Sequence, residues 1–313
     1  MKVLVCFFLL LSLALSASAK SPAKTVLTAN KVWLEKRLTK IGLSQAFIRE
    51  ALKDYEPQPF EKVLTLNLLG FLRVPGQHMN LVTPQAVHET AKFIAENQDS
   101  FDLAKEKYKV PADVISALLW IETRHGQDVG TFHTVSVFLD LLQADLAPNR
   151  KELIKLAYVQ NVKNQQGYSR KNLRQVMAER TKKKAQWAEG ELIQLAAIRK
   201  EKNLDIKTLR GSYAGAFGLP QFIPSSYRMY AKSVDPETTP DLSDDGDAIV
   251  SVAYYLMKSG WRGSRVGAGT HQDNRVIALM KYNNSRDYAD SILTISRRVA
   301  AEHMSAGKNS PEE

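Results

Sequence analysis

Apolar residues recur every three or four positions along most of the chain, and this spacing predicts amphipathic helices. Near the N-terminus two helices are expected, capped by Asn30 and Ser44. Another begins at Thr83-Pro84, where the threonine caps the helix and the proline occupies its first turn. For the apolar run from Leu64 to Leu81 we expect an extended stretch that ends in a loop. The pattern as a whole predicts a mainly α protein.

The segment from Val110 to Gly126 predicts a buried helix with a carboxylate near its end. Glu122 follows Leu118 by four residues, so it borders the apolar face of that helix. Burial and the negative end of the helix dipole both raise the pKa of a carboxyl group, and a general acid needs a raised pKa. The simpler interpretation is a solvated glutamate paired with Arg124 or Lys105, and this segment alone favours it.

The segment from Gly211 to Tyr227 combines glycines with aromatic residues. It has neither of the glycine patterns of nucleotide-binding loops. Gln221 is suited to hydrogen-bond a sugar, and rings such as Tyr213 and Phe222 are suited to pack against sugar faces. A tight structural turn with core aromatics explains the same residues equally well.

The first 19 residues have the pattern of a cleavable secretory signal peptide. Lys2 precedes a short apolar run, Val3 to Leu15, and an A-x-A site ends at Ala19. We therefore expect a periplasmic or secreted protein without a stable membrane anchor after cleavage. Cleavage removes Cys6, the only cysteine, which excludes disulfides, thiolate metal sites and a cysteine nucleophile.

Composition adds a charge bias to this picture. The chain carries a formal net charge of +10, and 44% of its residues are hydrophobic, which is enough for a globular core. An exported basic protein is suited to an anionic polymer or surface. The basic helical segment 149–205 is either a solvated lysine-rich face or the wall of a groove for such a polymer. It has few interleaved aromatics, and the chain has no zinc-finger or RNA-binding signature, so nucleic acid is not the expected partner.

Four blocks of the sequence resemble the lytic murein transglycosylase B family of lysozyme-like enzymes, and the similarity extends over nearly the whole mature chain. The blocks are Ile121–Gly126, Gly211–Tyr227, Asp247–Leu256, and Tyr282–Ser285 with Tyr288. The resemblance implies a lysozyme-like catalytic core with an additional helical lobe and little β structure. The expected order is a signal peptide (1–19), an N-terminal helical region (20–98), the first part of the catalytic core (99–148), a basic helical insertion (149–205), the second part of the core (206–304) and a disordered tail (305–313).

The resemblance also implies an activity. It makes Glu122 the single acid/base of an enzyme that cleaves the bond between N-acetylmuramic acid and N-acetylglucosamine in peptidoglycan glycan strands. The product ends in 1,6-anhydro-N-acetylmuramic acid, because the C6 hydroxyl of the sugar attacks in place of water. A lysozyme-type muramidase that uses water, and a non-catalytic peptidoglycan-binding protein, are the alternatives. Asp128, the nearest carboxylate to the central motif, is interpreted as structural.

By position in these blocks, several polar and aromatic residues are expected to bind substrate. They are Ser212, Tyr213, Gln221, Phe222, Tyr254, Tyr282 and Asn283. Lys183 and Lys184 stand roughly where relatives carry paired arginines, but lysine lacks the bidentate fork of arginine. No cofactor and no oligomeric state are indicated.

Relatives often carry a calcium-binding loop, and residues 233–247 occupy its place. Ser233, Asp235, Glu237 and Asp247 keep oxygen ligands at alternating and final positions. Threonine replaces the usual glycine, however, and two prolines interrupt the loop. We therefore expect no metal here, and interpret the segment as an acidic loop that caps the helix at Asp247.

Overall fold

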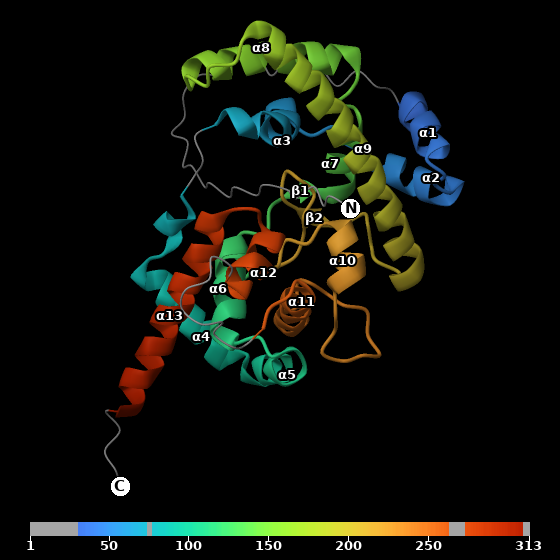
Figure 1. Ribbon diagram of the computed structural model, residues 1–313. Coiled ribbons are helices and arrows are strands. Elements are labelled where there is room, and N and C mark those ends of the chain that lie inside the picture. Colours follow the sequence, from blue (N-terminus) through green and yellow to red (C-terminus); the bar gives the residue numbers. More distant parts are fainter. Residues whose placement is uncertain (1–30, 74–76, 263–272, 309–313) are drawn as a thin grey trace.

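The computed structural model describes residues 31–73, 77–262 and 273–308. The predicted signal peptide, 1–19, lies outside the described residues. Figure 1 shows a chain built almost entirely of helices, as predicted. The helices are α1 (Lys31–Lys40), α2 (Gln45–Lys53), α3 (Leu66–Leu69), α4 (Pro84–Glu96), α5 (Gln98–Tyr108), α6 (Ala112–Thr123), α7 (Thr134–Leu142), α8 (Ala147–Lys163), α9 (Arg170–Lys202), α10 (Pro224–Tyr230), α11 (Asp245–Lys258), α12 (Asn274–Tyr282) and α13 (Arg286–Lys308).

Local capping signals set several of these helix starts. The Ser44 side chain accepts a hydrogen bond from the backbone N–H of Phe47, and Thr83 accepts one from that of Ala86. Each bond satisfies one of the free N–H groups in a first helical turn. The predicted caps at Ser44 and Thr83 are therefore confirmed. At the other end of the chain, α13 extends to Lys308, into the segment expected to be a tail.

The apolar run from Leu64 to Leu81 is not extended, and that prediction was wrong. Its described part is helical: a π-helical turn (Glu61–Thr65) leads into α3, and two 3₁₀ turns follow (Gly70–Leu72 and His78–Leu81). Leu64, Leu68, Leu69 and Leu72 of this segment are buried in a hydrophobic core. Burial of a continuous apolar run is compatible with either a strand or a helix, and periodicity alone does not separate them.

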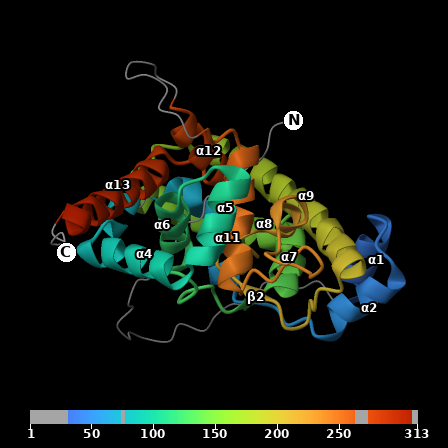
Figure 2. The ribbon, with the colours of Figure 1, turned by 90° about the horizontal axis from the view of Figure 1, so that it is seen from below.

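Two hydrophobic cores organise the molecule. The first core is built from α4, α5, α6, α11, α12 and α13, and the second from α1, α2, α3, α7, α8 and α9. Figures 1 and 2 show these groups as the two halves of the molecule. A short antiparallel ribbon, β1 (Phe132–His133) and β2 (Arg210–Gly211), lies between them. Because α6 belongs to the first core and β1 follows it closely, the end of α6 faces the junction of the two halves.

The basic segment forms α8 and the long helix α9, which pack against α7 and α3. The apolar positions of α9, such as Leu192 and Leu195, are fully buried, whereas most of its lysines are exposed. Arg37 ties α1 to this group by ion pairs of 2.8 Å to Asp145 and 2.9 Å to Glu189. Within the described residues, none of the helices combines the length and apolarity that a membrane span requires.

Candidate active site

The end of α6 is fixed by an unusual turn. Arg124, His125 and Gly126 have consecutive positive φ angles of 52°, 54° and 87°. For the two residues with side chains this left-handed backbone costs about 1–2 kcal/mol each. The backbone N–H of Arg124 donates to Trp120 O at 2.9 Å, and that of His125 donates to Leu119 O at 3.3 Å, which closes the last turn. The helix therefore ends at Thr123, slightly before the predicted stop at Gly126, and holds Glu122 in its final turn.

His125 anchors this turn. Its ring stacks on Phe93 with centroids 4.1 Å apart, and its Nε2 lies 2.9 Å from the backbone oxygen of Ser116. Burial lowers the pKa of His125 to about 4. The imidazole is therefore neutral at physiological pH and acts as a packed hydrogen-bond donor, not as a proton carrier.

Thr123 connects the turn to the glycine-rich block, Gly211 to Tyr227. Its hydroxyl donates to the backbone oxygen of Leu219 at 2.9 Å and accepts from the N–H of Gly126 at 3.0 Å. Leu219 in turn donates its own N–H to Leu242 O at 2.8 Å. Three separate parts of the chain thus position the residue next to Glu122.

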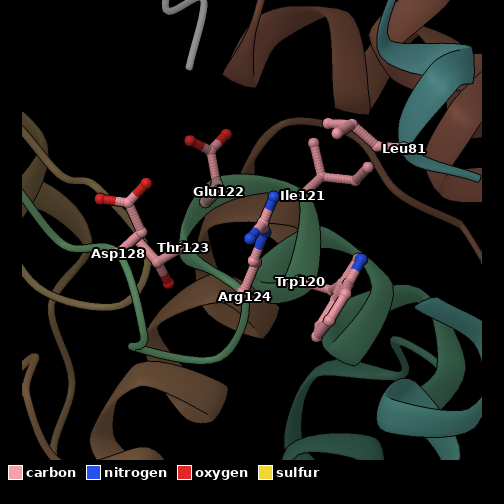
Figure 3. A pocket seen from close by; sticks show the side chains of 7 residues that line it. All are labelled: Leu81, Trp120, Ile121, Glu122, Thr123, Arg124 and Asp128. Atoms are coloured by element: carbon pink, nitrogen blue, oxygen red, sulfur yellow. The ribbon is translucent and has the colours of Figure 1, made fainter. Parts of the chain in front are cut away.

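Glu122 is a buried carboxyl group at the wall of a pocket. Only 4% of the residue is exposed, and its Oε1 accepts a 2.6 Å hydrogen bond from the Tyr288 hydroxyl. Burial raises its pKa to about 7, although the hydrogen bond from Tyr288 acts in the opposite direction. Figure 3 shows the pocket, in which the carboxyl groups of Glu122 and Asp128 point to the same side. The lining residues are Leu81, Trp120, Ile121, Glu122, Thr123, Arg124 and Asp128.

Three tyrosines surround this carboxyl group. Tyr282 stacks near Tyr288 at 6.4 Å and meets Tyr255 edge-on at 4.6 Å. Its hydroxyl donates to the backbone oxygen of Pro220. Burial, and then the charge of Glu122, raise the pKa of both Tyr282 and Tyr288 well above the usual value. Both phenols therefore stay protonated and remain donors.

The glycine-rich turn is packed against protein. A Cβ on Gly215 would lie 2.5 Å from Cζ of Phe138, and one on Gly218 would lie 2.4 Å from Cβ of Leu242. Both glycines also have positive φ, of 81° and 72°. Phe217 is buried beside this turn in a small hydrophobic cluster with Phe222 and Tyr227, apart from the two main cores. These contacts give the glycines and this aromatic ring a structural role.

Some predicted binding residues hold the turn itself. Ser212 accepts a hydrogen bond from the N–H of Ala216 at 3.3 Å. Gln221 donates from Nε2 to Val129 O at 3.1 Å, whereas its buried Oε1 has no hydrogen-bond partner among the described residues. The backbone oxygen of Tyr213 accepts from Asn67, which belongs to the other half of the molecule.

The remaining predicted residues lie in different surroundings. Phe222 is buried and packs beside Tyr282 at 5.9 Å, and Asn283 is buried directly after Tyr282 at the end of α12. Tyr254 lies against Tyr108 at 5.4 Å and under the Lys232 ammonium at 4.5 Å. The structure therefore groups Phe222 with Tyr282, next to Tyr288. Tyr254 lies farther from Glu122 and is joined to Tyr255 through Tyr230, with ring centroids 6.4 Å and 4.5 Å apart.

Lys183 and Lys184 lie on α9 in the second core. Lys183 has a 3.9 Å contact with Glu179, and the Lys184 ammonium lies 3.9 Å from the centre of the Trp187 ring.

Tyr288 and Tyr255 lie at the site but were not among the predicted site residues. Tyr288 closes the fourth block, and Tyr255 follows Tyr254 in the third, yet neither was selected as a site residue. Tyr288 donates to Glu122, and the charge of Glu122 contributes to the raised pKa of Tyr255. The available signal was the presence of both tyrosines within the blocks that carry the resemblance.

Asp247, at the end of the loop 233–247, accepts hydrogen bonds from other residues of the same loop. Asp247 accepts from the Ser233 hydroxyl at 2.9 Å, from the Val234 N–H at 2.8 Å and from the Asp241 N–H at 2.8 Å. Among the described residues there is no group of three or more His, Cys, Asp or Glu side chains arranged to hold a metal ion. These donors engage both oxygens of Asp247, so a cation would have to displace them to use this carboxylate.

Comparisons with known proteins agree with this architecture. A family model described as a transglycosylase SLT domain matches residues 28–275. The membrane-bound lytic murein transglycosylase B of Escherichia coli (strain K12) is 30% identical over 180 residues, which are 58% of this chain and 40% of that protein. The match thus spans two fifths of the length of this relative.

Solved structures share the fold. The Escherichia coli lytic transglycosylase Slt35, in complex with bulgecin A, superposes with a TM-score of 0.63 at 21% identity, over 87% of this chain and 92% of its own. Slt35 has also been solved with calcium. SltB3 of Pseudomonas aeruginosa, in complex with NAG-NAM-pentapeptide, gives 0.62 at 17% identity, over 86% and 78%. Because the family model covers most of the sequence, the chain belongs to the transglycosylase SLT domain family.

Proposed function

We propose that this protein is a peptidoglycan lytic transglycosylase and that Glu122 is its single acid/base. The observation that carries the proposal is the buried Glu122 carboxyl group, with a pKa near 7, at the wall of a pocket. A group with this pKa is protonated in a large share of molecules near neutral pH, as a general acid must be. The family supports the same substrate class, since one neighbour was crystallised with NAG-NAM-pentapeptide.

The proposed reaction needs only one carboxyl group. Neutral Glu122 donates its proton to the glycosidic oxygen as the bond to the leaving sugar breaks. The resulting carboxylate accepts the proton of the C6 hydroxyl, whose oxygen forms the new bond to C1. The hydrogen bond from Tyr288 stabilises the carboxylate between these steps. The glycan is thus cleaved without water, and the product carries the 1,6-anhydro ring.

A hydrolase is the second candidate, and a specific residue favours it. Asp128 is exposed and lines the same pocket as Glu122. Two carboxyl groups on one pocket are the arrangement that glycosidases use to activate water or form a covalent intermediate. The backbone N–H of Asp128 donates to Thr123 O at 2.9 Å, which fixes its position relative to the end of α6.

Mass spectrometry of a peptidoglycan digest separates these functions. The mature protein is incubated with purified peptidoglycan, and the released muropeptides are weighed. Products lighter by one water than those of a muramidase support transglycosylation, whereas reducing-end products establish hydrolysis. The Asp128→Asn variant is the matched control: a transglycosylase keeps its activity, and a hydrolase that uses Asp128 loses it. Retained binding without products indicates the non-catalytic alternative.

The substrate pocket and the location of the protein complete the proposal. The proposed binding residues are Gln221, whose Oε1 has no hydrogen-bond partner among the described residues, and Ser212, Tyr213, Phe222, Tyr254, Tyr282 and Asn283. The peptidoglycan substrate lies outside the cytoplasm, so the proposal requires export through the N-terminal segment. N-terminal sequencing of the protein from cells is expected to begin at Lys20.

A further inference from the structure

A second cavity, of about 320 Å³, lies at the opposite end of α6 from Glu122. Asp113 lines this cavity and precedes Glu122 by nine residues, which corresponds to about 14 Å along the helix axis. The other walls come from the start of α12 and from α13, and Figure 2 shows α12 and α13 next to α6. The volume lies within the range of small-molecule binding sites, about 300–1,000 Å³.

The rim of this cavity carries alternating charges. Arg275 makes a bidentate pair with Asp273, with a shortest contact of 2.6 Å, and Arg286 pairs with Asp290 at 2.9 Å. Hydrogen bonds from Arg275 hold the pKa of Asp273 below its usual range, and the charge of Arg286 adds to the effect. The two ion pairs thus line the same cavity, with two cations and two anions among its lining residues. Their side chains are all more than a third exposed, so they are accessible to a ligand.

The floor of the cavity is apolar. It is formed by Val114, Trp261, Val276 and Leu293. Trp261 is only 5% exposed, and its indole Nε1–H has no hydrogen-bond partner among the described residues. An apolar floor below a rim of both charges is suited to a short zwitterionic peptide, whose small side chains enter the cavity while its carboxylates and amine reach the rim. A purely anionic polymer fits less well, because the rim charges balance one another.

We infer that this cavity binds the peptide stem of peptidoglycan, at a site separate from the glycan-cleaving pocket. The choice of this peptide rests on the proposed function, whereas the cavity and its rim do not. Carboxylates of the stem accept from the guanidinium N–H groups that Arg275 and Arg286 do not use for Asp273 and Asp290, since each guanidinium has five N–H donors. Such a site holds the enzyme on the cell wall while Glu122 acts on a glycan strand.

The four tryptophans of the sequence provide a direct test, because each gives one indole N–H signal in a ¹H–¹⁵N spectrum. Trp261 lines this cavity and Trp120 lines the catalytic pocket, while Trp33 and Trp187 belong to the second core. The mature protein is titrated with a free peptidoglycan pentapeptide. We expect the Trp261 signal to shift and the signals of Trp33 and Trp187 to stay. Each indole signal is assigned from the spectrum of the variant in which that tryptophan is replaced by phenylalanine. If Trp261→Phe does not fold, the Trp261 signal is assigned by elimination from the variants of the other three tryptophans.

Substitution of the two rim arginines tests whether they bind the pentapeptide. In the Arg275→Gln/Arg286→Gln double variant we expect the Kd of the pentapeptide to rise about tenfold for each lost charge-assisted contact. Arg228→Gln is the matched control, because Arg228 forms a similarly exposed 2.7 Å pair with Glu201 far from the cavity. A shift confined to Trp120, no shift at all, or a Trp261 shift with an unchanged Kd in the double variant would overturn the inference.

This test is independent of catalysis, because the pentapeptide contains no glycosidic bond. If the glycan digest yields no products and Trp261 still responds, the proposed activity fails and the peptide site stands. If the digest yields anhydro products and Trp261 does not respond, the activity stands and the peptide site is excluded.

Discussion

Two buried carboxyl groups, one in each half of the molecule, have closely similar surroundings. In the first core, Glu122 accepts a 2.6 Å hydrogen bond from Tyr288. In the second core, Asp140 accepts a 2.7 Å hydrogen bond from Tyr55. Burial raises the pKa of each to about 7, and in each case the tyrosine hydrogen bond acts against the rise. The raised pKa alone therefore does not distinguish a catalytic acid from a structural one.

The two groups differ in what else reaches them. The second oxygen of Asp140 accepts from the backbone N–H of Gln58 at 2.7 Å, and Tyr55 in turn accepts from Gln143 at 2.8 Å. Asp140 is completely buried, so its bonds fasten the segment at Gln58 to α7. Glu122 instead lines a pocket, and the one side-chain hydrogen bond that it makes within the described part of the chain engages Oε1. Access to a pocket, not the proton affinity, separates the proposed catalytic role of Glu122 from the structural role of Asp140.

The largest effect is expected from Glu122→Gln. The amide has nearly the same shape but cannot transfer a proton, and loss of a general acid costs roughly 10²–10⁴-fold in rate. We expect release of soluble muropeptides to fall by at least about 100-fold, while binding to peptidoglycan and Tm stay close to those of the wild type. Near-wild-type release by this variant would remove Glu122 from the mechanism.

Asp140→Asn is the matched substitution in the other half, and it should affect stability instead of catalysis. The amide group places an N–H against one of the two donors, Tyr55 or Gln58. A buried polar group left without its partner costs about 1–3 kcal/mol. Urea unfolding measures this loss, and the activity of the folded variant should match the wild type. A large loss of activity at full stability would mean that Asp140 is more than a structural acid.

The same variant has a defined pH dependence. Asp140 has a higher pKa in the folded protein than in the unfolded chain, so the folded state binds the extra proton. Its stabilising contribution is complete below about pH 4, the unfolded pKa, and is lost as pH rises through its folded pKa of about 7. Asp140→Asn should therefore show a shallower fall in stability between pH 4 and 7 than the wild type, as measured by urea unfolding across that range.

Local signals explain what the sequence could predict about the fold. The caps at Ser44 and Thr83 involve residues only three positions apart, so their chemistry is visible in a short window. The helical form of Leu64–Leu72 depends instead on burial against α7, α8 and α9, which a short window does not contain. Glu122 was found because apolar periodicity and the resemblance pointed to the same position.

The rest of the site depends on contacts between distant parts of the chain. Tyr288 meets Glu122 across 166 residues, from α13 to α6, and no periodicity encodes that contact. Tyr254 and Tyr255 are adjacent, but successive residues on a helix point about 100° apart. Only the packing of α11 shows that Tyr255 faces Tyr282 while Tyr254 faces Tyr108.

A smaller effect is expected from Tyr288→Phe. This substitution removes the tyrosine hydrogen bond to Glu122, which corresponds to the Tyr55 bond to Asp140. Loss of this donor removes a group that stabilises the carboxylate, so the pKa of Glu122 should rise above its value of about 7. The alkaline limb of kcat/KM, which reports deprotonation of Glu122 in the free enzyme, should move to higher pH. Because the phenol also stabilises the carboxylate formed during catalysis, kcat should fall by about tenfold. An unchanged or downward shift of the limb would show that Tyr288 does not act on Glu122.

The smallest effect concerns Asp247, another buried carboxyl group, which lies in the acidic loop. Like those of Asp140, both of its oxygens accept hydrogen bonds within the protein. Oδ1 accepts from Ser233 and Val234, and Oδ2 accepts from Asp241. A cation would have to displace these donors. The loss of their hydrogen bonds offsets much of the free energy that cation binding contributes. We therefore expect calcium added to metal-free protein to leave Tm nearly unchanged and to give no saturable heat by calorimetry. A saturable, stabilising response would show that the loop reopens around calcium, and that Asp247 resembles Glu122 in being available to an external partner.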